Sequence, residues 1–291
     1  MNKFGAQNMY TELKTVLIKK PQPFMSSVDY KKWNYDYPLN QNLIDNNYKE
    51  FLNIIKKFDI EIIELKLRDE KNELCDSIFT HDPSLITNEG AIILNMGKEI
   101  RKPETIEHEE LYKSLGIPII DKLDDNATVE GGDCLWVNNK LLLIGKSSRT
   151  NIKGINQMQE ILKRINVTVV PVDLPLINNN SCFHLMSIVS ILDQDLIIGY
   201  KKHMSDDLIN ILNKNSIKLI EIPEEEYINS KTLAVNILSL SPRNLVLLKG
   251  YPMTCEILLK ENCVLNLFSG NELCIKTEGG PTCLTRPIWR I

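Results

Sequence analysis

The feature that most constrains this chain is a strand pattern that returns about every 50 residues. In each copy an apolar strand precedes a strand that carries a polar residue, and another apolar strand often follows after a tight turn. The leading strands are expected at 62–66, 117–123, 167–174, 217–223 and 263–268. The strands with a polar residue are expected at 76–87, 128–137, 182–191, 233–241 and 279–288. The final strands of the first four copies are expected at 90–96, 140–145, 195–200 and 244–250.

Turn and helix signals complete each copy. Short turn sequences separate the last two strands, at Asn88-Glu89-Gly90, Asn138-Asn139, Asp193-Gln194 and Pro242-Arg243. Apolar residues at helical spacing predict helices at 42–58, 154–165 and 206–215. Each copy is therefore expected to contain three strands and a helix.

Polar residues of reactive types recur at nearly the same interval. The spacings are 48 from Asp82 to Glu130, 54 to His184, 52 to Asn236 and 47 to Cys283. Such a period is typical of a repeat array, and a closed array is a propeller whose equivalent residues face one axis. An ordinary α/β protein with accidental spacing is the alternative. No linker or composition break divides the chain, so a single domain over 1–291 is expected.

Composition limits the class of protein. Hydrophobic residues make up 43% and charged residues 25% of the 291 positions, as in ordinary soluble domains. A net charge of −4 argues against a nucleic-acid binder. No signal peptide and no run of 18 apolar residues is present, which argues against a membrane protein. Seven cysteines without a CxxC pair indicate reduced thiols, and hence a cytoplasmic protein.

Cys283 and His184 are the candidates for covalent chemistry. Cys283 follows Gly279, Gly280 and Pro281 in EGGPTCLTRP, and the glycines permit a turn that would expose the thiol to a ligand. His184 lies in the otherwise apolar CFHLMSIVSI. A Cys–His pair provides a thiolate nucleophile and a proton carrier. Each residue could instead be an inert core side chain.

Two carboxylates are candidates for orienting the reaction. Glu130 precedes Gly-Gly in NATVEGGDCLW and is expected to hold the histidine or a substrate nitrogen. Asp133 in the same turn could instead satisfy backbone donors. Asp82 lies in DSIFTHDPSLIT, where a carboxylate needs a partner, and guanidinium groups bind carboxylates through two parallel hydrogen bonds. Both carboxylates could also make structural hydrogen bonds alone.

A metal site is the main chemical alternative. His81, Asp82, His184 and Cys283 could in principle bind zinc, but no HExxH or CxxC spacing supports it. Neither GxGxxG nor GxxxxGK[ST] occurs, so no nucleotide cofactor is expected.

Taken together, these motifs resemble the guanidino-group modifying (pentein) superfamily, and within it the dimethylarginine dimethylaminohydrolases. The resemblance runs from about residue 10 to the end, and is strongest in CDSIFTHDPSLIT, NATVEGGDCLWVNNKLLLIGKSSRTNIKG, FHLMS and GGPTCLT. It implies a five-bladed α/β propeller that uses neither metal nor cofactor.

The resemblance also implies roles for individual residues. Cys283 would be the nucleophile, His184 the general acid and base, and Glu130 the third catalytic residue. Asp82 would bind the guanidinium nitrogens. The remaining substrate-pocket positions are Asp76, Arg101 and Arg149, of which the two arginines would hold the substrate carboxylate.

Two departures from the pattern bear on the substrate. His81 stands where the dimethylarginine hydrolases usually carry Glu, so it counts as a further substrate-binding position. The ending GGPTCLTRPIWR is more similar to arginine deiminases and amidinotransferases. However, Met186 occupies the position at which arginine deiminases carry a second carboxylate, which favours the dimethylarginine branch.

The expected activity is hydrolysis of an N-methylated arginine to citrulline through a covalent thiouronium adduct on Cys283. Arginine deiminase or dihydrolase activity, amidine transfer through the same adduct, and a binding module without activity are the alternatives. The expected partner is a small-molecule substrate, and the sequence leaves a homodimer open.

Overall fold

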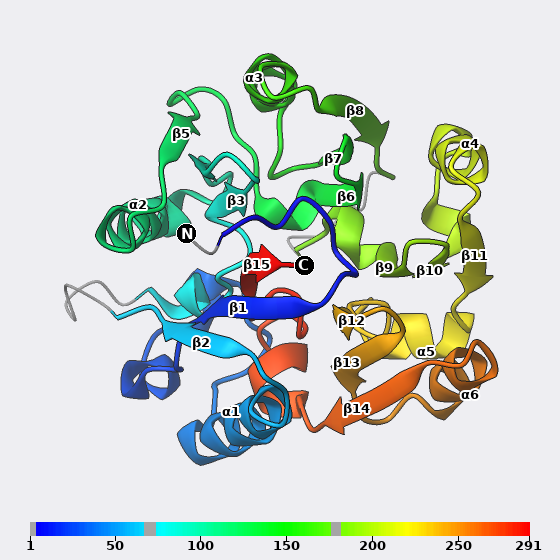
Figure 1. Ribbon diagram of the computed structural model, residues 1–291. Coiled ribbons are helices and arrows are strands. Elements are labelled where there is room, and N and C mark those ends of the chain that lie inside the picture. The colour runs from blue at the N-terminus through cyan, green and yellow to red at the C-terminus, as the bar shows by residue number, and fades with distance from the viewer. Residues whose placement is uncertain (1–3, 67–73, 176–181) are drawn as a thin grey trace.

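The computed structural model describes residues 4–66, 74–175 and 182–291. Within these ranges the strands form five three-stranded sheets set around a common axis, as Figure 1 shows. Four sheets, from the inner to the outer strand, are β3 (Ser84–Ile86), β4 (Ala91–Ile93) and β5 (Ile119–Lys122); β6 (Cys134–Asn138), β7 (Leu141–Lys146) and β8 (Thr168–Asp173); β9 (Val189–Asp193), β10 (Leu196–Gly199) and β11 (Lys218–Glu221); and β12 (Leu238–Ser241), β13 (Asn244–Leu248) and β14 (Val264–Phe268). The fifth is β15 (Arg286–Arg290), β1 (Leu13–Ile18) and β2 (Glu61–Glu64).

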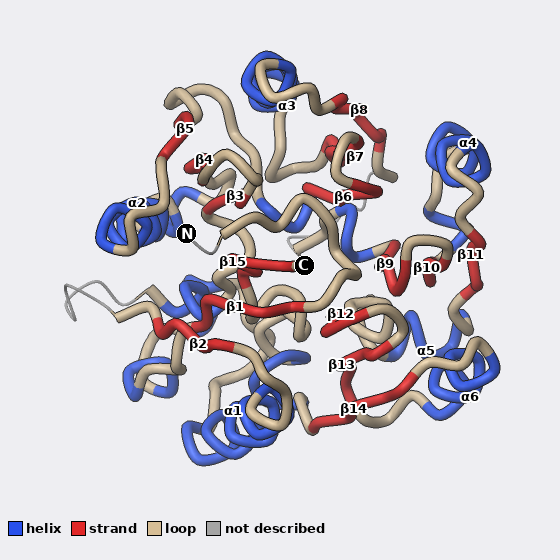
Figure 2. The backbone as a smooth tube through the Cα atoms, viewed as in Figure 1, coloured by secondary structure: helices blue, strands red, loops and turns tan. Residues whose placement is uncertain are grey.

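Every sheet is built by the same path of the chain. The inner strand pairs antiparallel with the middle strand, and the middle strand pairs parallel with the outer strand. A parallel pair requires a crossover, and a helix provides it in each sheet. These helices lie at the periphery of the ring (Figure 2). They are α1 (Gln41–Ile55), α2 (Glu104–Ser114), α3 (Ile152–Lys163), α4 (Asp206–Lys214) and α6 (Pro252–Lys260).

Local sequence explains where the crossover helices begin and which face they bury. The Asn40 side chain accepts a hydrogen bond from Leu43 N at the start of α1, and Asn151 accepts one from Gly154 N at the start of α3. The apolar stripe of α1 is buried in the core. A short additional helix, α5 (Glu224–Asn229), follows β11. No helix in the described ranges is long and apolar enough to cross a membrane.

The fifth sheet closes the ring with both ends of the described chain. β15 pairs antiparallel with β1, with Leu17 opposite Arg286 and Leu13 opposite Arg290. β1 in turn pairs parallel with β2 through the α1 crossover. The N-terminal strand therefore completes the blade that the C-terminal strand begins.

The predicted α/β five-bladed propeller is confirmed, but the predicted grouping of strands was wrong. Each leading strand belongs to the preceding sheet: the strand predicted at 117–123, for example, is β5 and pairs with β4. The crossover helix returns the chain to the edge of its own sheet before the next one starts. Likewise, the first strand of the fifth copy, β14, belongs to the fourth sheet. The last strand of that copy, β15, pairs with β1, a strand that the pattern analysis missed.

A second correction concerns the strands that were expected to carry the polar residues. Asp82, Glu130, His184 and Cys283 precede their strands and lie in turns or beside short 3₁₀ helices. The 3₁₀ helices are η3 (Cys75–Ile78), η5 (Gly131–Asp133) and η6 (Leu185–Ser187). A regular strand would send alternate side chains to opposite faces, whereas these turns let one polar residue per blade face the axis.

Candidate active site

Five turns, one before each inner strand, meet at one end of the propeller axis. They carry Asp82, Glu130, His184, Asn236 and Cys283, the residues whose spacing revealed the repeat. Four of the five, all except Glu130, line a single cavity. Glu130 is fully buried behind the ring of His184. The structure thus brings together the side chains that the sequence marked as a set.

A circuit of hydrogen bonds joins these turns around the axis. Each bond runs between neighbouring blades and involves at least one backbone group. The bonds are His81 N to Cys283 O at 3.2 Å, Gly131 N to Asp82 O at 3.0 Å, Leu185 N to Asp133 Oδ1 at 2.9 Å, Ile237 N to Ser190 Oγ at 3.2 Å and Thr282 N to Asn236 Oδ1 at 3.0 Å. Buried polar groups of the turns are thereby satisfied, and each turn is positioned by the next.

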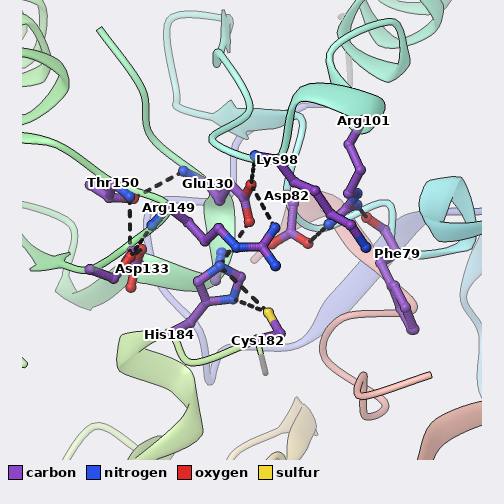
Figure 3. Close-up of polar contacts among 12 residues, drawn as sticks. Phe79, Asp82, Lys98, Arg101, Glu130, Asp133, Arg149, Thr150, Cys182 and His184 are labelled. Atoms are coloured by element: carbon purple, nitrogen blue, oxygen red, sulfur yellow. Dashed lines mark hydrogen bonds and ion pairs between the residues drawn. The ribbon is translucent and has the colours of Figure 1, made fainter. Parts of the chain in front are cut away.

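His184 and Glu130 form a buried acid–base pair. His184 Nε2 donates to Glu130 Oε2 at 2.9 Å, as Figure 3 shows. The other carboxylate oxygen accepts a hydrogen bond from Lys98 N at 3.0 Å. Burial alone would raise the pKa of Glu130, but the hydrogen bond and charge of His184, together with Arg149, lower it below its ordinary value. The carboxylate therefore fixes the orientation of the imidazole.

The same surroundings keep His184 protonated. Burial would lower its pKa, but Cys182, Asp133 and Glu130 outweigh that effect and raise the pKa well above its ordinary value. The resting imidazole is therefore a proton donor.

Close packing explains why Glu130 is followed by two glycines. A Cβ atom at residue 131 would lie 2.0 Å from the backbone oxygen of His81. A Cβ atom at residue 132 would lie 2.3 Å from His184 Nδ1, so any larger residue there would displace the imidazole.

Cys283 lies at the wall of the cavity and is held by Asn236. The Asn236 Nδ2 group donates to Cys283 Sγ at 3.3 Å, while Oδ1 accepts from Thr282 N. Burial, followed by the charge of Asp82 and by Cys182, raises the pKa of the Cys283 thiol to about 12. Without a ligand, the thiol is therefore neutral at physiological pH.

A second cysteine near His184 escaped the sequence analysis. Cys182 Sγ lies 3.5 Å from His184 Nδ1 and 3.8 Å from Nε2, and it too lines the cavity (Figure 3). It is two residues from His184 in sequence, and no flanking glycines or period marked it. Cys182 is therefore a rival nucleophile that experiments must separate from Cys283.

Asp82 is engaged by Arg101, contrary to the role expected of that arginine. Arg101 Nη1 donates to Asp82 Oδ2 at 2.7 Å, and its other nitrogens donate to Glu104 and to two carbonyl oxygens. With 3% of its surface exposed, Arg101 is poorly placed to bind a substrate carboxylate. Although burial opposes ionisation, Arg101 and His184 hold the pKa of Asp82 well below its usual range. Arg101 thus keeps Asp82 ionised.

The remaining charged residues of the cavity also pair with neighbouring side chains. Asp76 accepts a hydrogen bond from Tyr35 at 2.6 Å and pairs with Lys98 Nζ at 2.6 Å. Arg149 Nη1 lies 3.6 Å from Glu130 Oε1, a looser contact than those of Arg101. Both Lys98 and Arg149 line the cavity, so a ligand carboxylate would meet cations there. Lys98 was not among the predicted residues.

His81 does not face this cavity. Its Nδ1 lies 2.8 Å from Thr285 O, and the ring lines a separate cavity on the far side of the turns. The expectation that His81 contacts the substrate is therefore wrong, because neighbours in an irregular turn can face opposite ways. Asp133 accepts hydrogen bonds from Leu185 N and, at 2.6 Å, from Ser147 Oγ, so it does satisfy a backbone donor.

The side chains considered for zinc are not arranged as ligands. Over 4–66, 74–175 and 182–291, no group of three or more His, Cys, Asp or Glu side chains could hold a metal ion.

Comparison with known proteins points to one group. The family model for arginine deiminase matches residues 70–208. An uncharacterised protein of Bacillus subtilis is 27% identical over 97% of this chain and 93% of its own length. N(G),N(G)-dimethylarginine dimethylaminohydrolase of Pseudomonas aeruginosa is 27% identical over 77% of this chain and 81% of its own. A solved structure of a variant of the Pseudomonas aeruginosa enzyme with citrulline has a TM-score of 0.78, at 24% identity over 96% of this chain and 100% of its own.

The chain has the fold of the pentein superfamily. The five sheets, the cavity at the axis and the structural similarity over nearly the whole chain agree on this point. Two residues with reactive or charged side chains that line the cavity, Cys182 and Lys98, were not among the predicted site residues. They reach the cavity through the folding of turns that carry no distinctive motif.

We predict that the Glu130→Gln variant lowers the pKa of His184. The neutral amide removes a negative charge and an acceptor that both favour the imidazolium. Histidine resonances followed by NMR across the pH range would report the change, with His108 on helix α2 of another blade as an internal reference that should not move. An unchanged titration of His184 would show that Glu130 does not sustain its charge.

A second prediction concerns the Cys283 thiol. Because an opposite charge nearby shifts a pKa by about 1–3 units, the cationic reagent 2-chloroacetamidine should favour the thiolate that it alkylates. We expect it to react at pH 7 at least about tenfold faster than neutral 2-chloroacetamide, after each rate is divided by that for free cysteine. Peptide mass spectrometry would locate the alkylated residue, and Cys283→Ser would serve as the control. Equal normalised rates would contradict cation-assisted ionisation.

Proposed function

We propose that this pentein hydrolyses the guanidinium group of an N-methylated arginine, with Cys283 as nucleophile. The observation that carries the proposal is that Cys283, the His184–Glu130 pair and the ionised Asp82 meet at one cavity. The relatives support the coarser class, a guanidino-group hydrolase or transferase.

Asp82 is suited to bind the planar cation. Its two oxygens already accept from Arg101 Nη1 and Gly132 N, but each retains acceptor capacity. As the substrate cation approaches, the Cys283 pKa falls and its proton leaves to solvent. The resulting thiolate attacks the central guanidinium carbon.

The positive charge of His184 before the reaction suits the first chemical step, which requires a proton donor for the leaving amine. As the new S–C bond forms and a C–N bond breaks, the imidazolium gives its proton to the departing methylamine or dimethylamine. The neutral imidazole then accepts a proton from water as the oxygen attacks the thiouronium carbon. As this adduct collapses, its hydroxyl proton is lost to solvent, and citrulline and the Cys283 thiolate are released. Glu130 stabilises the imidazolium that reforms.

The lining of the cavity supports a methylated substrate. Met186 and Phe79 offer apolar surface, and Met186 stands where a second carboxylate would be expected for plain arginine. Arg149 and Lys98 are the cations that would meet the substrate carboxylate. Asp76, paired with Lys98, orients that cation.

The rival activities share the same adduct. An amidinotransferase would pass the amidine group to an amine, and a deiminase would accept arginine. A binding module would need no chemistry at this cavity. The protonated histidine held by a buried carboxylate would then have no role, which argues against this alternative.

We predict citrulline release from asymmetric dimethylarginine and monomethylarginine at higher kcat/KM than from arginine. Cys283→Ser should reduce kcat by at least about 10³-fold, because the hydroxyl replaces the attacking sulfur. Cys255→Ser, a change on the distant helix α6, is the matched control and should retain full activity. Cys182→Ser should keep measurable turnover.

Three outcomes would overturn parts of this proposal. Equal or faster turnover of arginine would refute the methylated substrate. Product that appears only when an amine is supplied would replace hydrolysis by amidine transfer. Full activity of Cys283→Ser would refute the nucleophile.

A further inference from the structure

A second cavity lies on the propeller axis, behind the turn that carries Cys283. It is lined by residues of the inner strands β6, β9, β12 and β15, together with the chain near residues 6–9. Figure 1 shows β15 at the centre of the ring that these strands form. Met186 contributes to both cavities, so the two are neighbours along the axis.

Three residues that line this second cavity each carry a hydrogen-bond donor without a partner among residues 4–66, 74–175 and 182–291. The donors are Arg286 Nε, Arg290 Nε and Trp136 Nε1, and their residues are only 4%, 7% and 3% exposed. Buried polar groups are normally satisfied, and leaving one unpaired is costly. All three groups are N–H donors that cannot act as acceptors. The missing partner must therefore be an acceptor.

The two arginines also lack an opposite charge. Arg286 Nη2 donates to the carbonyl of His81, and Arg290 donates to the carbonyls of Thr11 and Ser239. No ion pair to a carboxylate is formed by either residue within the described ranges, whereas Arg101 pairs with both Asp82 and Glu104.

A buried cation without a counter-charge is strongly unfavourable. Burial accordingly lowers the pKa of both guanidiniums, that of Arg290 to about 9. Tyr112, Cys134 and Asp82 offset this only in part at Arg286, and no charged group offsets it at Arg290. The cavity thus combines net positive charge with donors that have nothing to bind.

We propose that the cavity binds a small monovalent anion of the halide type, held by the N–H groups of Arg286, Arg290 and Trp136. Its volume is about 20 Å³, room for one or two particles the size of a water molecule. A monatomic anion such as chloride suits a space of this size. An anion would both accept hydrogen bonds from these donors and neutralise the positive charge, whereas a water molecule would only accept hydrogen bonds.

Bromide provides a direct test, because it replaces chloride and scatters anomalously. Crystals of the wild-type protein grown without chloride and soaked in sodium bromide should show an anomalous peak in the cavity, next to the two guanidiniums. Density for water alone, without an anomalous peak, would overturn the proposal.

Thermal unfolding tests the same site in solution. At constant ionic strength, replacing gluconate by chloride should raise Tm along a saturable curve, by about 3–6 °C at tenfold above Kd. Arg290→Met should abolish this response. The matched control Arg164→Met removes an exposed guanidinium on α3's C-terminal side and should keep the full response. A wild-type Tm that does not respond to chloride, or a response retained by Arg290→Met, would refute the site; if that variant fails to fold, the bromide experiment decides.

Discussion

The circuit of hydrogen bonds between neighbouring turns is the constraint on which the candidate site depends. Each reactive side chain sits on a turn that has no regular secondary structure of its own, so its position is set by the adjacent blade. Asp82 O accepts from Gly131 N, and His81 N donates to Cys283 O. Cys283 lies shortly before β15, the strand that pairs with β1 and closes the ring. Ring closure therefore helps to position the turn that carries Cys283.

The electrostatics of the site depend on charges that are paired before any ligand arrives. Arg101 keeps Asp82 ionised, and Cys182, Asp133 and Glu130 keep His184 protonated, while the Cys283 thiol remains neutral. A cation that enters changes the balance at the sulfur, since it is attracted by Asp82 and favours the thiolate. Under the proposed function, this balance would reserve the nucleophile for positively charged substrates and protect it from neutral electrophiles.

Much of this arrangement could be predicted from the sequence, because a closed repeat converts spacing into geometry. The interval near 50 residues identified Asp82, Glu130, His184, Asn236 and Cys283, and the fold places all five turns at the axis. The limits of each blade could not be predicted in the same way. An apolar strand has the same sequence pattern whether it begins one sheet or ends another. Its sheet is determined by the crossover helix that precedes it.

Other failures have equally local causes. The direction of a side chain in an irregular turn has no sequence period, so His81 was assigned to the wrong side of the turn. The ion pairs of Arg101 could not be foreseen, because its partner Glu104 lies on the following helix, where a charged sequence gave no sign of burial. Helix α2 was missed for the same reason: its buried residues include Glu104 and His108 rather than an apolar stripe.

The most direct measurement of the central claim is to locate the covalent adduct. In His184→Gly, S-methyl-L-thiocitrulline should still form a covalent thiouronium adduct with the protein, because its methanethiolate leaving group needs little help from an acid. Hydrolysis of that adduct should be slow without the imidazole. Acid quenching followed by peptide mass spectrometry should place the adduct on Cys283. An adduct on Cys182, or none on any cysteine, would contradict the assignment of Cys283 as nucleophile.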